Sequence, residues 1–283
     1  MARVSALLHS RATTVVAVLV ALVVAAGSWS AAPNAALLPA FVGLGFWTVG
    51  NYLLVPLRWH SLSASGQSRR WHLRVYAEAE VLGLLSPAHA GTDLWRVRML
   101  RTVGMDRASA VVDVAADRLV GGAGIVVVAL LGGATLPPAF LWVAVGGSAV
   151  ALTVGLLLQR RKRFAIAIPP RRSLARGVLV SLLYQCCAIG LLVGAVAAVG
   201  HSVPVIDMIG IVGASQVAAL VPGVHGAGPK EGALAAGLVA MGEPLAAAIG
   251  AISLAATLAW IPALTLGGAS HVARRRALAR AAA

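Results

Sequence analysis

Long apolar runs constrain this chain more than any other feature. A helix needs about 20 apolar residues to cross the hydrocarbon core of a bilayer. The chain is 59% apolar and 11% charged, against about 25% charged in soluble domains, which excludes a water-soluble globule, a nucleic-acid-binding domain and a disordered chain. We predict an all-α integral membrane protein with six transmembrane helices, at Thr13–Trp29, Ala35–Leu57, Ser109–Leu131, Ala139–Leu158, Gly177–Val199 and Leu245–Gly268.

Two further apolar regions, about 75–100 and 205–241, are interrupted near their middles by proline and glycine. Proline lacks the backbone N–H that a helix needs, and glycine adds backbone freedom, so each interruption breaks a helix. Irregular backbone survives at membrane depth only where protein buries it or where it lines a water-filled cavity. We therefore predict two re-entrant helical hairpins, in each of which two half-helices meet at a turn inside the membrane.

The basic residues predict the orientation. All 23 Lys and Arg residues except Arg118 and Lys230 fall in the two ends of the chain and in one alternating set of connections, whereas the opposite connections, near 30–34, 132–138 and 200–204, hold none. Because Lys and Arg are retained in the cytoplasm, we predict a multi-pass protein of the cytoplasmic membrane with both termini in the cytoplasm. The first hairpin then enters and leaves from the cytoplasmic side, and the second from the outside.

The two hairpins share an ordered pattern of proline, histidine, small residues and an acid. A glycine follows the acid after eleven residues in both, Gly104 after Asp93 and Gly242 after Glu231. Each half then contains three crossings, an odd number, so the second half is inserted upside down. We predict one membrane domain over 1–283, an inverted repeat with halves at 10–134 and 135–270, and a basic cytoplasmic tail at 271–283.

Two simpler interpretations of these patterns exist. A pair of helix kinks in an ordinary bundle would give the same breaks. The first apolar run, with Arg3 and Arg11 before it and small residues after it, also fits a cleaved signal peptide. We adopt the inverted repeat, which requires the first apolar run to be a membrane helix. Inverted repeats are the architecture of many secondary transporters, whose substrate site lies near the middle of the membrane.

Ionisable residues within the first half are candidate substrate-binding residues. Each costs about 2.5–3.5 kcal/mol near the centre of a membrane helix, so each demands a partner or a function. Asp113 and Asp117 are four residues apart and share a helix face, Arg118 adjoins them, and Asp93 and Arg96 lie just past the first hairpin turn. These five residues predict a site for an anionic group; the alternative is a structural ion network that fixes helix packing.

The second hairpin offers another anion site. The free N–H groups at a helix start carry partial positive charge and favour anions, and Lys230 lies at such a start. Gly226 and Gly228 would let the backbone approach a ligand closely. We predict that these residues bind a phosphate, with Glu231 and His225 beside it; the alternatives are a local helix cap by Glu231 and a structural histidine.

Other chemistry has no candidate residues in the sequence. We find no metal-ligand spacing, no nucleophile elbow and no catalytic carboxylate pair beside a nucleophile. Cys186 and Cys187 are adjacent in an apolar run and fit neither a disulfide framework nor a metal site. We therefore expect no enzyme activity, no cofactor, no metal and no nucleic-acid partner.

With these residues in view, the chain resembles the lysylphosphatidylglycerol synthase transmembrane family, a family of flippase-like integral membrane proteins, from about residue 10 to residue 270. Three stretches carry the resemblance. They are Pro87 to Arg101, where Gly91, Asp93 and Arg96 match a pattern of proline, Gly-Gly-Asp and arginine; Asp117-Arg118-Leu119, an acid–Arg–Leu element; and Pro222 to Gly232, a proline, glycine-rich, Glu-Gly element.

Some positions depart from the family pattern. Thr92 stands where a second glycine is usual, Val224 and His225 stand where glycine and proline are common, and Lys230 is at a variable position. Two-part members of the family carry a soluble aminoacyl transfer domain after the membrane part. Only a short segment follows Gly268 here, so we expect a stand-alone membrane domain that does not make the lipid itself.

The resemblance implies lipid translocation, with membrane lipids as partners and anionic, aminoacylated or polyprenyl-linked lipids as cargo. Two alternatives stay open. We expect the lipid headgroup to occupy a polar cavity between the two hairpins, and the same cavity would serve an ion-coupled transporter of a small soluble anion. The chain would also suit a non-catalytic membrane partner of a lipid synthetase or glycosyltransferase.

Overall fold

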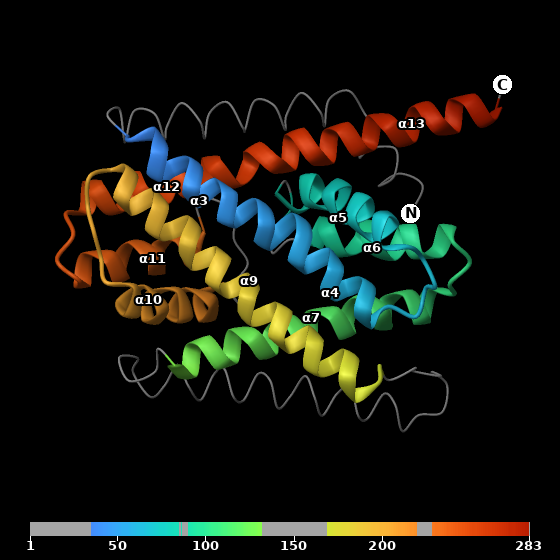
Figure 1. Ribbon diagram of the computed structural model, residues 1–283, viewed down its shortest axis with the longest axis horizontal. Helices are drawn as coiled ribbons and strands as arrows, with labels where there is room; N and C mark the ends of the chain where they lie inside the picture. Colours follow the sequence, from blue (N-terminus) through green and yellow to red (C-terminus); the bar gives the residue numbers. More distant parts are fainter. Residues whose placement is uncertain (1–34, 85, 87–89, 132–168, 220–227, 283) are drawn as a thin grey trace.

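The described part of the chain is helical throughout. The computed structural model describes residues 35–84, 86, 90–131, 169–219 and 228–282 (Figure 1). The all-α prediction is therefore confirmed for these ranges. The elements are α3 (Leu37–Val49), η1 (Gly50–Leu54), α4 (Val55–Leu62), α5 (Arg69–Leu84), α6 (Ala90–Thr102), α7 (Arg107–Leu131), α9 (Arg171–Ala198), α10 (Val205–Ala218), α11 (Pro229–Ala240), α12 (Leu245–Pro262), η3 (Ala263–Gly267) and α13 (Gly268–Ala282).

Two long helices each contain a π-helical segment next to a proline. η1 joins α3 to α4 just before Pro56, and η3 joins α12 to α13 just after Pro262. Proline cannot donate the helical hydrogen bond and its ring crowds the preceding turn, and a local change of helical register accommodates both effects. The helix therefore continues through each proline, which gives two rods at 37–62 and 245–282.

Three helices in the described ranges are long and apolar enough to span a membrane, at Leu37–Leu62, Arg171–Ala198 and Leu245–Ala277. Leu38 and Phe41 on α3 and Leu179 on α9 are large apolar side chains that point outward and are exposed. An outward apolar surface of this kind suits contact with lipid rather than with water. The structure thus supports association with a membrane.

The three helices correspond to three of the six predicted crossings. The predicted crossing Ser109–Leu131 corresponds to α7 (Arg107–Leu131), which is not one of these three helices. The predicted crossings Thr13–Trp29 and Ala139–Leu158 lie outside the described residues.

α3 and α9 run side by side in opposite directions (Figure 1). The Ala36 N–H, just before α3, donates to the Ala198 carbonyl at the end of α9 at 2.7 Å. Gly43 and Gly194 meet where the two helices cross, and a Cβ on Gly194 would lie 2.6 Å from the Pro39 carbonyl oxygen. Small residues allow backbones to approach this closely, which is how helices gain packing energy in an apolar solvent.

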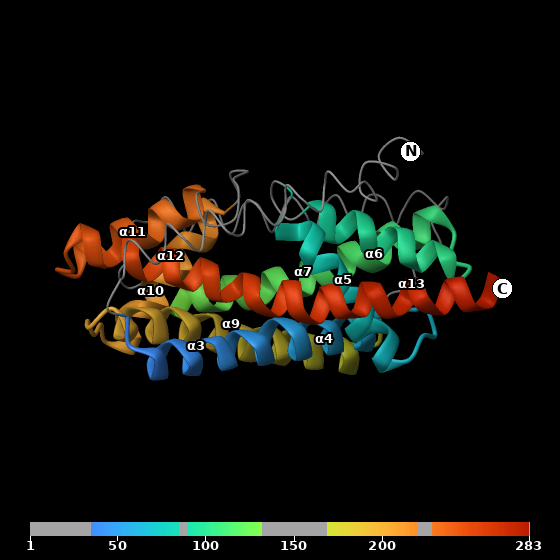
Figure 2. The ribbon, with the colours of Figure 1, turned by 90° about the horizontal axis from the view of Figure 1, so that it is seen from above.

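The two predicted hairpins are helix pairs at opposite ends of the molecule. α5 packs against α6 at one end, and α10 packs against α11 at the other (Figures 1 and 2). Gly91 is essential to the first pair because a Cβ there would lie 2.4 Å from the Leu82 carbonyl oxygen. The helices extend the first predicted range to 69–102 and nearly match the second, at 205–240.

Contacts between helices repeat when the two halves are exchanged. In the predicted repeat, α4, α5, α6 and α7 of the first half correspond to α9, α10, α11 and α12 of the second half. Four contacts in the first half then have counterparts in the second. The pairs are α4–α5 and α9–α10, α5–α6 and α10–α11, α6–α7 and α11–α12, and α4–α7 and α9–α12. Each set encloses its own hydrophobic core, one around Trp59 and Leu100 and the other around Met208 and Leu238. These four contacts between described helices follow the pattern that the predicted repeat requires.

The second helix of each hairpin ends in the same way. Gly104 and Gly242 have φ angles of +96° and +93°, a conformation that glycine adopts without strain. The N–H of the next residue donates to a carbonyl five residues earlier, in the pairs Met105–Leu100 and Glu243–Leu238. This is the Schellman arrangement, and the following helix begins three residues after each glycine. The glycine spacing in the sequence thus marks matching helix ends.

Basic residues gather at one end of the described fold. Arginines lie at the starts of α5, α7 and α9, at the end of α6 and along α13, and these positions share the end that holds the first hairpin (Figure 1). At the opposite end, around α10 and α11, Lys230 is the only Lys or Arg within the described ranges.

We expect Gly194→Ala to lower the free energy of unfolding by about 1–3 kcal/mol, because the added Cβ must push the backbones of α3 and α9 apart. Denaturant titration in detergent micelles, followed by circular dichroism, measures this. Gly45→Ala is the matched control, since it adds the same atom to α3 where nothing lies within 4 Å. Equal stability of the two variants would contradict the close crossing.

Candidate functional site

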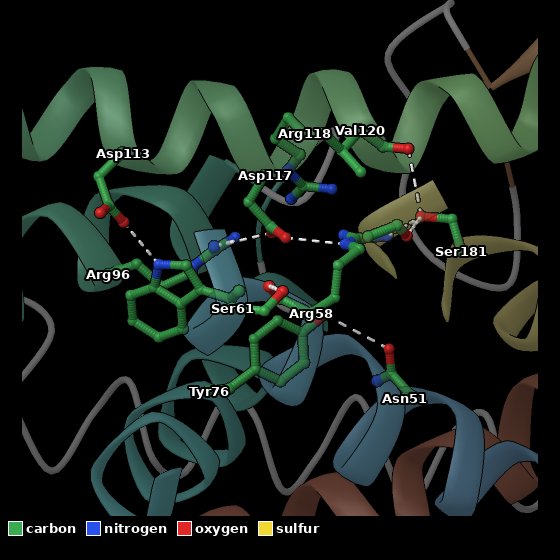
Figure 3. A network of polar contacts seen from close by, with 12 residues as sticks. Asn51, Arg58, Ser61, Tyr76, Arg96, Asp113, Asp117, Arg118, Val120 and Ser181 are labelled. Atoms are coloured by element: carbon green, nitrogen blue, oxygen red, sulfur yellow. Dashed lines mark hydrogen bonds and ion pairs between the residues drawn. The ribbon is translucent and has the colours of Figure 1, made fainter. Parts of the chain in front are cut away.

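A buried ion network lies between the first hairpin and the long helices. Asp117 on α7 accepts hydrogen bonds from the Arg58 Nε on α4 and from an Arg96 terminal nitrogen on α6, both at 2.8 Å (Figure 3). All three side chains are buried, and Asp117 is fully inaccessible. Two guanidinium groups on one carboxylate satisfy the charges only while α4, α6 and α7 stay together, so this network fixes their packing.

Neighbouring groups complete the network. Arg58 also donates to the Ser181 hydroxyl on α9 at 3.0 Å, and the Arg96 guanidinium lies 4.2 Å from the centre of the Trp59 ring. Asp113 does not share a cation with Asp117. Instead it accepts from Trp59 Nε1 at 2.7 Å and from the Ala64 backbone N–H at 3.0 Å, which ties the start of α7 to the end of α4.

Arg118 and Asp93 form an ion pair at the edge of this network. Arg118 Nε lies 3.0 Å from an Asp93 carboxylate oxygen, and the side chains are 48% and 35% exposed. Arg96 lies behind the pair, 3.7 Å from the same carboxylate. Arg118 is therefore the cation of the group that is accessible from outside, and Asp93 is the acid that forms an ion pair with it.

The structure brings five predicted site residues together: Asp93, Arg96, Asp113, Asp117 and Arg118. Their contacts are those of an ion network, in which the buried side chains of Asp117 and Arg96 pair with each other. Arg58, one of the basic residues on which the predicted orientation rests, is buried in the network and paired with Asp117.

The other predicted residues lie on the second hairpin. Gly228 precedes α11, and Lys230 and Glu231 lie in its first turn. The Gly228 N–H donates to a Glu231 carboxylate oxygen at 2.9 Å, so Glu231 makes the local helix cap that was the alternative to ligand binding. His225 and Gly226 lie outside the described residues.

A pocket of about 70 Å³ opens beside Lys230 and Glu231. Its other walls are mainly apolar and come from α3, α9, α10, α11 and α12, with Ser215 and Gln216 as polar exceptions. This is room for a few water molecules or a small anionic group. The pocket faces the second hairpin, and none of the described residues of the first hairpin lines it, which differs from the single cavity expected between both hairpins.

One sequence offset, the one from Asp93 to Glu231, relates positions in the ion network to positions that line the pocket. It relates Arg96 to Leu234, Asp117 to Ala255 and Arg118 to Ala256, and it relates Thr92, next to Asp93, to Lys230. At the three network positions the first half has charged side chains, whereas the second half has leucine and alanine.

Sequence reasoning missed several residues of the site. Glu80 on α5 is buried and accepts a hydrogen bond from the Asn51 side-chain amide on η1 at 2.8 Å. Its position within a mostly apolar half-helix was a signal that could have found it. Trp59 and Ser181 carried no such signal, because their roles depend on contacts between distant helices.

No group of three His, Cys, Asp or Glu side chains within the described ranges is placed to hold a metal ion. No protein-family model, curated protein or solved structure matches the chain.

We expect Asp117→Asn to lower the free energy of unfolding by about 3–5 kcal/mol. Arg58 would remain buried without a carboxylate, and Arg96 would keep only its longer contact with Asp93, at 3.7 Å. Denaturant titration in micelles measures the change. Asp207→Asn, the same change in the first turn of α10 and outside the network, is the control. A loss for Asp117→Asn no greater than that of the control would show that the network does not hold the helices together.

Proposed function

We propose that this protein is a lipid transporter of the cytoplasmic membrane that moves an anionic, aminoacylated or polyprenyl-linked lipid between the leaflets. The observation that carries the proposal is the pocket beside Lys230, where a cation and a helix start face mainly apolar walls. The cation and the helix start suit a headgroup phosphate. The apolar walls suit the part of the lipid next to that phosphate.

The proposal includes a topology of six crossings and two re-entrant hairpins, arranged as an inverted repeat with both termini in the cytoplasm. The repeated helix contacts and the paired glycine caps support two halves of one design. The placement of the hairpins at opposite ends supports insertion from opposite faces (Figure 1). The arginines at the end of the first hairpin support a cytoplasmic position for that end.

Two cations would contact the headgroup. Lys230 lies in the pocket wall, and its ammonium group has three N–H donors. Arg118 is half-exposed, and its ion pair among the described residues is with Asp93 at the surface of the network. A phosphate that reached Arg118 would compete with the Asp93 carboxylate for the same guanidinium, while Arg58 and Arg96 would stay bound to Asp117.

The motifs that resemble the flippase-like family agree with this assignment. Asp93, Arg118 and Glu231 are charged residues of the first, second and third matching stretch, and all three lie at the network or the pocket. Membership of that family is part of the proposal.

A second candidate is a transporter of a small soluble anion. The pocket volume of about 70 Å³ favours it, because a free phosphate or carboxylate fits such a space more completely than a lipid does. The two candidate functions differ in the transported molecule, a lipid or a soluble anion, and transport measurements on reconstituted vesicles distinguish them.

We expect Lys230→Gln to slow leaflet exchange of a fluorescent anionic phospholipid by about tenfold or more, since a hydrogen bond to a charged group contributes about 1.5–3 kcal/mol. Reconstituted vesicles and quenching of the outer-leaflet fluorophore measure the rate. Lys230→Arg should keep most of the rate because it keeps the charge. Arg98→Gln, an exposed arginine on α6 outside the site, should match the wild-type protein.

Exchange equal to that of empty vesicles with the wild-type protein would overturn lipid transport. Uptake of radiolabelled phosphate by the same vesicles, lost in Lys230→Gln, would then establish the soluble-anion function.

A further inference from the structure

Six exposed arginines at the end of the first hairpin have no acid partner. They lie in the first turns of α5 and along α13: Arg69, Arg70, Arg74, Arg275, Arg276 and Arg280. None of the six forms an ion pair with a described residue. Arg274 is different, since it belongs to the same arginine run of α13 but pairs with Glu78 at 2.9 Å.

Helices α5 and α13 carry these arginines on one surface. The two helices pack together (Figure 1). The Ser270 hydroxyl on α13 donates to the Arg74 carbonyl oxygen at 3.4 Å, and Gly267, just before α13, lies against the Ala77 carbonyl further along α5. The helices therefore run antiparallel, and the start of α5 lies beside the arginine run of α13. We call this the α5–α13 surface.

No side-chain carboxylate of the protein is left to neutralise the α5–α13 surface. The chain has nine Asp and Glu residues, and all of them lie in the described ranges. Asp106 caps the start of α7 through the Ala108 and Ser109 N–H groups. The other acids either lie on or next to α10 and α11 or make the first-half contacts given above: Asp207, Glu231, Glu243, Glu78, Glu80, Asp93, Asp113 and Asp117. The six arginines repel one another, so their neutralising charge must come from a partner.

The long α12–α13 rod places its arginines at the depth of lipid headgroups. At about 1.5 Å per residue, Arg275 lies about 45 Å along the rod from Leu245, and a bilayer with its headgroups is about 40–45 Å thick. Apolar side chains lie beside the arginines, since Val272 on α13 is 46% exposed and Trp71 on α5 is partly exposed. Basic and apolar side chains on one surface are typical of the membrane interface.

We propose that the α5–α13 surface binds the headgroups of anionic phospholipids in the leaflet at this end of the molecule, and that the bound lipid holds α13 against the first hairpin. Guanidinium groups form paired hydrogen bonds with phosphate oxygens, and here they come from two helices. The bound lipid stabilises the folded protein because it binds the packed helices and not the unfolded chain. It is a resident lipid, so the surface does not depend on the proposed transport.

Thermal unfolding of the full-length protein in micelles of an uncharged detergent tests this. Added phosphatidylglycerol should raise the midpoint temperature measured by circular dichroism, whereas phosphatidylcholine and inorganic phosphate should not. One basic residue near an anionic surface contributes about a fivefold gain in affinity. The double variant Arg275→Gln, Arg276→Gln should therefore need about 30-fold more phosphatidylglycerol for half of the rise. Lysine at both positions should keep most of the effect because it keeps the charge.

Two control variants locate the effect. Arg171→Gln, Arg172→Gln removes an exposed pair of arginines from the start of α9, and Lys230→Gln changes the pocket. Both should respond to phosphatidylglycerol as the wild-type protein does.

Each contrary outcome has a distinct meaning. No rise with phosphatidylglycerol, or an equal rise with inorganic phosphate, overturns lipid binding. An equal loss in the Arg171, Arg172 variant overturns the α5–α13 surface in favour of diffuse charge attraction. A loss in Lys230→Gln alone assigns the bound lipid to the pocket and overturns the surface. Stabilisation that depends on Arg275 and Arg276 in a protein that moves no lipid keeps the surface and refutes only the proposed transport.

Discussion

The cost of removing charge from water governs the first half of this molecule. Asp117 is fully buried with Arg58 and Arg96 on either side, and none of the three can lose its partners without a penalty of several kcal/mol. Because they come from three helices, their pairing fixes how the first hairpin sits against α4 and α7. The buried Arg58 side chain also requires a small residue beside it on α7, because a Cβ at Gly121 would lie 2.9 Å from the Arg58 guanidinium.

The second half of the proposed repeat has a different interior. At the equivalent sequence positions alanines and a leucine replace charged residues of the network, and these small and apolar residues line the pocket beside Lys230. In the proposed transporter the first half, closed by ion pairs, would be the fixed side, and the second half, with its pocket, would be the binding side.

Local patterns in the sequence predict the hairpins, but they do not predict contacts between residues that are far apart in the chain. The acid-to-glycine spacing marks the second helix of each hairpin, because Gly104 and Gly242 cap it in the same conformation. The ion network joins residues far apart in the chain, such as Arg58 and Asp117, and no local pattern specifies that pairing. The pocket exists because the side chains of Ala255 and Ala256 are small. In the sequence these two alanines look like part of an ordinary apolar helix face, so they do not predict a pocket.

Opposite insertion of the two halves is the claim on which the account depends, and side-specific cysteine labelling tests it most directly. In a background with Cys186 and Cys187 replaced by alanine, single cysteines at Ala64, Thr102, Ser202 and Met241 place a label on an exposed position near each hairpin boundary. The account predicts that a membrane-impermeant reagent added outside intact cells reaches the cysteines at 202 and 241 only. Labelling of all four from one side, or of 64 and 102 from opposite sides, would contradict it.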